Sequence, residues 1–589
     1  MNSWQNARLR GLTKAMGELP SSPFEPDREI GQVIEVQQAT IGVNLPKAAR
    51  PAQRRFGHRV PGGEVGEYVL IDVGDVAVLG RITRVRTTER DRMAVADLQR
   101  TTNQPIVPAG IVQPISTIEL DTARHVIGIS RYPRIGDRVY SAHPSFLSWM
   151  VALDTASRES TAVIALGTLA NNADVRVTAA PETVFGRHCA ILGSTGAGKS
   201  WTAARLVEEL MRLGIRTILL DATGEYHRLA GENVLHLCIG VKKDRPDSCH
   251  QVSLPYHALH EMDLFALLKP APGAQQPRLR EAIRSLRLAK VLGEENRLVT
   301  NGCIVKAEKP RQPFEDALRE HIGSVSDPMG PFDFTRLGEQ VHNECIWPTA
   351  KSGSPSFGQI NQQDVGYCSS LVMRIEAAAS STELSPVFDP LTKNILFPTV
   401  DKFLDSEKYA LLRLSLAHVP ASQDAREVVV NAIGRHLLRA ARNGQFLQRP
   451  LVVVLDEAHN FLEHAIGDDA DPFPLDAFEL IAKEGRKYGL LLCLATQRAR
   501  DLPEGVVSQV GTFLLHRVAN DRDRDLLERS GGDLERDALG ALPLLTPGEL
   551  IGMGIGFPIP LRIRVTAPSA PPDSSGPAFF PDDAHSTTD

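Results

Sequence analysis

The sequence is poor in aromatic residues and carries no excess of positive charge. Phe, Trp and Tyr make up 5% of its 589 residues, and no aromatic platform for stacking single-stranded nucleic acid is visible. The formal net charge is −6. Because phosphate backbones attract Lys and Arg, any surface for nucleic acid must be a local patch rather than the whole molecule.

Long apolar runs and paired cysteines are also missing. No run of about 18 apolar residues occurs, and the stretch MNSWQNARLRGLTKAMGELP lacks the apolar segment of a signal peptide. The seven cysteines are scattered and form no C-x-x-C pair, which argues against a zinc module or a disulfide framework. We therefore expect a soluble, cytoplasmic protein without a membrane partner.

What is present is an ordinary globular composition, with 42% hydrophobic and 23% charged residues, in a chain long enough for two or three domains. Residues 1–26 are polar and are expected to form an N-terminal arm. Residues 27–150 contain short β-branched runs separated by turn residues: IGQVIEV, YVLIDVG, VAVLGRITRV and MAVADLQ. This spacing predicts a small antiparallel β-barrel rather than a βαβ unit.

The rest of the chain predicts an α/β fold. HCAILGSTGAGKS, TAARLVEELMRLG and IRTILLDATGEY follow one another as strand, helix and strand, which is the beginning of a parallel sheet. We assign residues 151–244 to the first part of this core, 245–385 to a helical insertion and 386–566 to the second part of the core. Residues 567–589, rich in Pro, Ser and Asp, are expected to be a disordered tail.

The stretch GSTGAGKS, residues 193–200, fits the pattern G-x-x-x-x-G-K-[ST] in full. Glycines let backbone N–H groups turn toward phosphate oxygens, and the following helix adds its positive N-terminal dipole. Lys199 can reach the β and γ phosphates of a nucleotide, and Ser200 can ligate Mg²⁺. The expected ligands are therefore ATP and Mg²⁺. The expected cofactor-binding residues are Gly193, Ser194, Thr195, Gly196, Ala197, Gly198, Lys199, Ser200 and Trp201.

Two adjacent acidic residues end the predicted strand VVVLD. Asp456 is placed to hold Mg²⁺, and Glu457 to orient and deprotonate the attacking water. Such a pair favours hydrolysis over binding alone, since a site that only binds needs no base. Gln497 ends the strand LLLCLAT and could read the γ-phosphate, or be a plain exposed polar residue. Asp221 and Glu225 end another strand. They could contact Mg²⁺, water or a neighbouring subunit, or they could cap the loop that follows the strand.

Two arginines stand at the beginnings of predicted strands. Arg187 precedes the strand that leads into GSTGAGKS, the phosphate-binding loop or P-loop. Arg486 lies in KEGRKYG, ahead of the strand LLLCLAT. Phosphoryl transfer needs positive charge on the γ-phosphate, often delivered by another subunit. Both arginines stand at the end of the sheet away from the phosphate-binding loop, so they are badly placed to act on the nucleotide of their own subunit. Their position suits a ring in which one edge of each subunit faces the nucleotide of its neighbour. A solvated surface role is the alternative for each arginine.

Taken in order, these segments resemble the HerA family of the HerA–FtsK class of P-loop NTPases. The resemblance is carried by the β-rich N-terminal region and by GRHCAILGSTGAGKS, DATGEY, VVVLDEAHNF, EGRKYG, ATQRARDLPEGVVSQVGTFLLHRVAND and GELIGMGIGFPIPLRIRV. It covers residues 27–566, although the insertion matches in placement and not in sequence. DATGEY has Ala222 and Thr223 where the family has Pro and His, and ATQRAR replaces the frequent SQRP.

The resemblance implies an RecA-like motor in a homohexamer, with double-stranded DNA in its channel and a separate nuclease or anti-phage defence effector docked on the N-terminal barrel. Lys199, Ser200, Asp456, Glu457 and Gln497 match the family's ATPase residues. Arg486 matches a finger acting between subunits, and Arg187 a second basic residue at that interface.

Direct support for DNA is limited to two basic segments. One is the loop AQRRFGHR, residues 52–59, and the other is a set in the helical insertion: Arg278, Arg280, Arg284, Arg287 and Lys290. Each could contact phosphates, or form a solvated face or a subunit contact. Two other functions stay open: a scaffold ATPase that activates an effector such as a nuclease or a sirtuin-like NADase, and a conjugation or secretion motor. The second is disfavoured because such motors usually carry membrane segments.

Overall fold

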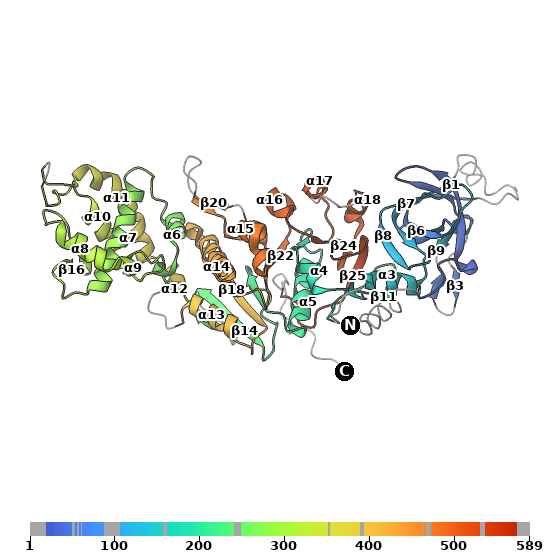
Figure 1. Ribbon diagram of the computed structural model, residues 1–589, viewed down its shortest axis with the longest axis horizontal. Helices are drawn as coiled ribbons and strands as arrows, with labels where there is room; N and C mark the ends of the chain where they lie inside the picture. The colour runs from blue at the N-terminus through green and yellow to red at the C-terminus, as the bar shows by residue number, and fades with distance from the viewer. Residues whose placement is uncertain are drawn as a thin grey trace, which may run out of the picture. The chain divides into compact units, whose positions relative to one another are not determined.

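The computed structural model divides the chain into two compact units, which are drawn in Figure 1. The first unit combines residues 1–186, 193–198 and 511–566, and the second combines residues 187–192, 199–510 and 567–589. The structure describes residues 19–49, 53–55, 58–60, 62–87, 107–156, 162–240, 249–351, 354–388, 394–462, 464–466, 473–530 and 536–573.

The first unit contains a closed antiparallel barrel of six strands. Its order is β2-β1-β9-β5-β6-β7, and pairing of β2 with β7 closes the sheet. The strands are β1 (Glu29–Val36), β2 (Ile41–Asn44), β5 (Tyr68–Asp72), β6 (Val76–Arg86), β7 (Ala109–Glu119) and β9 (Arg138–Ser141), and β8 (Arg124–Ile127) extends β7. Buried aliphatic side chains such as Ile30, Val43, Val78 and Val112 fill the interior. The predicted barrel is confirmed, while the run MAVADLQ lies outside the described residues.

Five further strands of the first unit form an antiparallel arrangement in the order β11-β10-β25-β24-β23. These are β10 (Ile164–Leu169), β11 (Asn172–Ala179), β23 (Thr512–Leu515), β24 (Glu549–Gly554) and β25 (Leu561–Val565). The chain's closing strands thus pair with strands that precede the P-loop. The unit's helices include α3 (Pro144–Ala156), α4 (Pro181–Phe185), α17 (Asp521–Ser530) and α18 (Arg536–Gly540).

The second unit is built on a parallel sheet in the order β12-β22-β19-β13-β18-β14-β15. The strands are β12 (Cys189–Leu192), β13 (Thr217–Asp221), β14 (Val234–Gly240), β15 (His250–Val252), β18 (Leu411–His418), β19 (Leu451–Leu455) and β22 (Leu490–Thr496). Runs such as LVVVL are buried throughout, as expected for strands covered on both faces. Flanking helices include α5 (Lys199–Arg212), α13 (Leu396–Asp405), α14 (Ala425–Arg442) and α15 (Ala477–Glu484). The predicted α/β fold is confirmed.

A helical group follows β15 and precedes β18. It contains α6 (Glu261–Leu268), α7 (Gln275–Leu292), α8 (Gln312–Glu320), α9 (Ile322–Val325), α10 (Leu337–Glu344), α11 (Gln362–Ser380) and α12 (Ser385–Phe388), and Figure 1 shows α7, α10 and α11 packed together. Because β15 pairs with β14, the helices begin after Val252 and not at residue 245.

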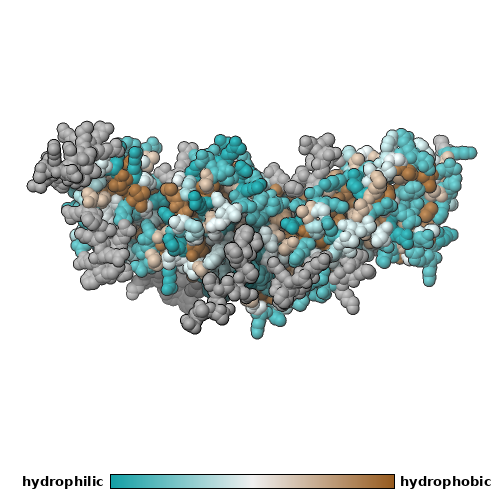
Figure 2. Space-filling model, turned by 180° about the vertical axis from the view of Figure 1, so that it is seen from behind, coloured by the Kyte–Doolittle hydropathy of each residue, from teal (hydrophilic) through white to brown (hydrophobic). Residues whose placement is uncertain are grey.

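No helix in the described part of the chain is long and apolar enough to cross a membrane. On the face drawn in Figure 2, hydrophilic residues lie among smaller hydrophobic groups, as is usual for globular surfaces.

Candidate nucleotide site

The P-loop glycines hold backbone conformations that other residues adopt only with strain. Gly196 has φ +73° and Gly198 has φ +110°, and a Cβ disfavours both values. A Cβ on Gly193 would come within 2.5 Å of the Cβ of His516. The close approach of these two segments of the chain therefore also requires glycine. The motif is thus dictated locally by backbone geometry.

Hydrogen bonds hold the same loop within the first unit. The N–H of Ser194 donates to the carbonyl of Arg517 at 2.9 Å, and the N–H of Gly548 donates to the carbonyl of Ala197 at 3.1 Å. Thr195, between them, is exposed. The loop is therefore anchored at both ends and presents its middle to solvent.

Lys199 and Ser200 begin α5 in the second unit. Burial lowers the pKa of Lys199, and the carboxylates of Glu457, Asp456 and Glu225 act in the opposite direction. These four side chains therefore share one electrostatic environment. Trp201 follows with 42% of its surface exposed.

The two acids of the predicted strand end lie where the sequence places them, directly after β19. Asp456 is 6% exposed, and burial, reinforced by the charges of Asp221 and Glu457, raises its pKa. Glu457 has φ 48° and ψ 45°, a left-handed conformation that is uncommon outside glycine. The chain therefore turns directly after β19, at the second of the two acids.

Glu457 Oε2 is buried and accepts no hydrogen bond from any residue that the structure describes. It lies 3.3 Å from His459 Nδ1, and the same ring nitrogen is hydrogen-bonded to Thr496 Oγ1 at 3.0 Å. Thr496 is the last residue of β22, and Gln497 follows it directly. The sequence-based predictions did not include His459, although it stands within DEAHN.

Asp221 caps its own loop. Its carboxylate accepts the N–H groups of Gly224, Glu225 and Tyr226 at 2.7–3.2 Å, and Arg413 Nε donates to it at 2.7 Å. Asp221 is fully buried, so these four donors satisfy it without a metal ion. Of the alternatives left open by the sequence, the structure supports loop capping.

Glu225 differs from Asp221, because it faces the start of α5. Burial and the charge of Asp221 raise its pKa, and hydrogen bonds with Thr223 and Ser200 lower it. Its contact with Ser200 brings a third carboxylate to the beginning of the P-loop helix.

Arg187 and Arg486 are exposed at the opposite end of the strands. β12 and β22 are parallel neighbours, and each arginine precedes its strand, whereas Asp456 and Gln497 follow theirs. The two arginines therefore share an edge of the sheet away from Lys199. Between them lies His188, which is 2% exposed and accepts the N–H of Leu492 at Nδ1.

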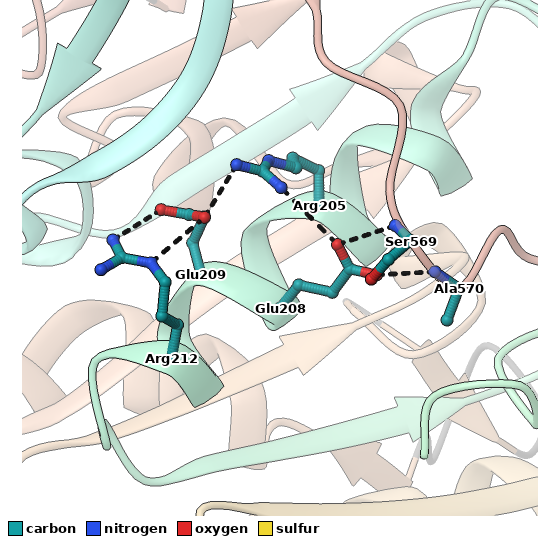
Figure 3. A network of polar contacts seen from close by, with 6 residues as sticks. All are labelled: Arg205, Glu208, Glu209, Arg212, Ser569 and Ala570. Atoms are coloured by element: carbon teal, nitrogen blue, oxygen red, sulfur yellow. Dashed lines mark hydrogen bonds and ion pairs between the residues drawn. The ribbon is translucent and has the colours of Figure 1, made fainter. Parts of the chain in front are cut away.

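The segment that follows β25 is held against the P-loop helix (Figure 3). Glu208 of α5 accepts the N–H and hydroxyl of Ser569 and the N–H of Ala570, at 3.1, 2.7 and 2.8 Å. The N–H of Asp573 donates to the carbonyl of Glu225. These contacts correct the expectation of a disordered tail from residue 567, at least as far as Asp573, because the half-buried Glu208 carboxylate supplies acceptors for its backbone.

The basic residues of α7 are largely engaged within the protein. Arg278 pairs with Asp364, Arg280 pairs with Glu261, and Arg284 lies near Glu281. Arg287 donates to two carbonyl groups. These contacts account for four of the five α7 basic residues without DNA. The side chains of the other basic segment, residues 52–59, lie outside the described residues.

The parallel sheet, the P-loop before α5 and the acidic residues after β19 define a P-loop ATPase. The family model described as "Helicase HerA, central domain" matches residues 164–330. The chain is 22% identical over 550 residues to the DNA double-strand break repair helicase HerA of Saccharolobus solfataricus, covering 91% of this chain and 92% of that protein. It is 23% identical over 441 residues to the protein of that name from Pyrococcus furiosus, covering 73% of each. The predicted resemblance to the HerA family is confirmed.

Among solved structures, VirB4 of Thermoanaerobacter pseudethanolicus matches with a TM-score of 0.41 and 18% identity, over 69% of this chain and 97% of that one. The plasmid coupling protein TrwB in complex with ADP and Mg²⁺ matches with a TM-score of 0.43 and 12% identity, over 71% and 92%.

Proposed function

We propose that this protein is an ATP-driven translocase that acts on double-stranded DNA as a homohexamer. The proposal depends chiefly on one observation: a glycine-rich loop leads into Lys199 at the start of α5, and the acidic pair Asp456 and Glu457 directly follows β19. The charges of Glu457, Asp456 and Glu225 act on Lys199. Such an arrangement suits hydrolysis of a nucleoside triphosphate.

The residues fit Mg²⁺ and ATP. Burial raises the pKa values of Asp456 and Glu225, and repulsion from neighbouring carboxylates, Glu457 among them, adds to both shifts. A divalent cation would relieve this repulsion. No cluster of three or more His, Cys, Asp or Glu able to hold a metal occurs among the described residues. Ser200 and Asp456 would hold Mg²⁺ together with phosphate oxygens and water, because Mg²⁺ keeps several waters and takes few protein ligands.

In this proposal each polar group has a distinct task. Lys199 neutralises charge on the β and γ phosphates, and the glycine-rich backbone around Gly196 cradles them. Glu457 orients the attacking water and accepts its proton at the unpartnered Oε2. Gln497, at the end of the adjacent strand, contacts the γ-phosphate. Bound Mg²⁺ supplies charge that stabilises the transferring phosphoryl group.

The ring is proposed because the two arginines are in the wrong place to serve their own chain. Arg187 and Arg486 are exposed at the edge of the sheet opposite to Asp456. In a hexamer this edge would face the next subunit's nucleotide, where Arg486 would stabilise the transition state. Arg187 would lie at the same interface.

The DNA substrate is proposed from the relatives that are named DNA double-strand break repair helicases. We further propose that the protein is cytoplasmic and that a separate nuclease or anti-phage effector docks on the barrel. A ring that mainly activates such an effector, a nuclease or a sirtuin-like NADase, is the alternative, with little translocation.

The test is ATP hydrolysis by the purified protein, measured with and without duplex DNA. We expect stimulation by DNA, loss of turnover in Lys199→Ala, and retained ATP without turnover in Glu457→Gln. Glu320→Gln, on the exposed end of α8, is the matched control and should behave as wild type. Hydrolysis by Glu457→Gln at the wild-type rate would refute the assigned base, and an absence of DNA stimulation would favour the scaffold alternative.

The hexamer has its own test. Native mass measurement should report six copies, and Arg486→Ala should lower turnover while ATP affinity stays close to wild type. Mixed rings of wild-type and Arg486→Ala chains should lose more activity than their composition predicts, because each arginine serves a neighbour. A strictly proportional loss would refute the action between subunits.

A further inference from the structure

His459 lies between the ends of two neighbouring parallel strands, β19 and β22. It belongs to the short turn Ala458–Asn460 that follows the acidic pair. Its Nδ1 is 3.0 Å from Thr496 Oγ1 and 3.3 Å from Glu457 Oε2. One ring nitrogen therefore faces both the proposed base and the strand end that carries Gln497.

Thr496 contacts both the imidazole ring and the loop after β22. It is fully buried, and its Oγ1 accepts the N–H of Arg498 at 3.1 Å. The hydroxyl group has only one proton to donate, and His459 Nδ1 lies within its reach. The Thr496 hydroxyl thus links the backbone of the loop after β22 to the imidazole ring.

Burial lowers the pKa of His459 below its ordinary value, which favours the neutral form of the ring. A neutral imidazole carries its proton on one nitrogen only. When Nδ1 accepts from Thr496, it offers no proton to Glu457 Oε2, which then keeps its lone pairs without a donor from this ring. When Nδ1 carries the proton, it can donate a hydrogen bond to Thr496 Oγ1 or to Glu457 Oε2, but it cannot donate a strong hydrogen bond to both at once.

We propose that His459 is a positioning residue that couples the end of β22 to the orientation of the Glu457 carboxylate. This inference rests on the proposed function, since it assigns Glu457 to the attacking water. It adds that contact of Gln497 with the γ-phosphate, by shifting Thr496, alters which partner the imidazole engages. The Glu457 carboxylate would then be oriented toward the attacking water only after the end of β22 has shifted on binding the nucleotide.

A purely structural role makes a different prediction. A histidine that only supports the loop after β22 would affect stability and nucleotide affinity when removed. A positioning residue affects kcat with little change in KM for ATP, because it acts on the attacking water rather than on binding. The two roles can therefore be separated by kinetics.

The experiment compares steady-state ATP hydrolysis by wild type, His459→Ala, His459→Asn and Thr496→Val. We expect His459→Ala to lower kcat by about 10- to 100-fold, the scale of a misplaced catalytic group, with KM nearly unchanged. Asparagine places an amide group near the position of Nδ1, so His459→Asn should recover much of the loss. Thr496→Val keeps the shape but removes the hydroxyl, and should lower kcat in the same direction.

The double variant His459→Ala/Thr496→Val tests the coupling itself. If both residues act through one hydrogen bond, the second substitution should add little to the first. Wild-type kcat in His459→Ala, fully additive losses, or a change confined to KM and thermal stability would each overturn the inference. A wild type that does not hydrolyse ATP would overturn the proposed function, and this inference with it, whereas the other outcomes leave the proposed function standing.

Discussion

Acidification should destabilise the second unit through His188, which stands directly before β12. The side chain is 2% exposed, its Nδ1 accepts the N–H of Leu492 at 3.0 Å, and its Nε2 lies 3.0 Å from the carbonyl of Ala482. Nε2 must therefore carry the single proton of a neutral ring. Protonation of Nδ1 would break the bond to β22 and bury a charge, and burial accordingly lowers the pKa of His188 to about 4.

The size of the effect follows from the difference between the folded and unfolded states. In the unfolded chain the imidazole titrates near 6.5, and in the folded chain near 4. Below the unfolded value the unfolded state binds the extra proton, so folding stability falls as pH falls. A difference of about 2.5 units corresponds to about 3 kcal/mol. This stability is fully present above about pH 6.5 and is lost by about pH 4.

The assay is urea unfolding of wild type and His188→Asn, followed by circular dichroism between about pH 7.5 and about pH 4.5. Asparagine does not titrate in this range and tolerates the positive φ of 58° at this position. Other titrating groups affect both proteins equally and cancel in the difference. Wild type should lose most of its advantage over the variant as the pH falls. A difference in free energy of unfolding that is independent of pH would refute the assignment.

Two further predictions concern other parts of the second unit. Lys306→Met should destabilise the helical group by about 3–5 kcal/mol, because it leaves the buried carboxylate of Glu344 without its ion pair. Thermal unfolding should show that most of the lost stability is restored in Lys306→Met/Glu344→Gln. A loss of under about 1 kcal/mol in Lys306→Met would contradict a buried pair. Glu208→Ala should raise amide exchange in residues 567–573 about tenfold or more, since a charged acceptor is worth at least 1.5 kcal/mol. Mass spectrometry of that peptide, with Arg212→Ala as the control, tests the contact, and unchanged exchange would exclude it.

Predictions that depend on local pattern agree with the structure. Alternating β-branched runs gave the closed barrel, since their inward side chains must share one interior. The P-loop could be located because glycine is required at Gly196 and Gly198 by the backbone alone. The adjacent acids, Asp456 and Glu457, could be placed at a strand end because an apolar run of five residues stops there.

Partnerships between distant residues could not be predicted in this way. Arg413 lies inside an apolar strand, so the sequence indicates that a buried acidic partner must neutralise its charge. The sequence does not indicate which one, because the partner Asp221 lies 192 residues away. The arginines of α7 form a basic stripe in sequence, and only the packing of neighbouring segments shows that acids such as Asp364 and Glu261 pair with them.

The sequence by itself therefore determined where the glycine-rich loop and the acidic strand end lie, because each depends on chemistry within a few consecutive residues. Tertiary structure alone decided that Asp221 is paired with Arg413, while Glu225 faces Ser200. It also decided that Ser569 is held on Glu208 and that His459 joins two strand ends. The physical reason is that a polar side chain's role is set by the partners available where it is buried, and folding brings those partners from distant parts of the chain.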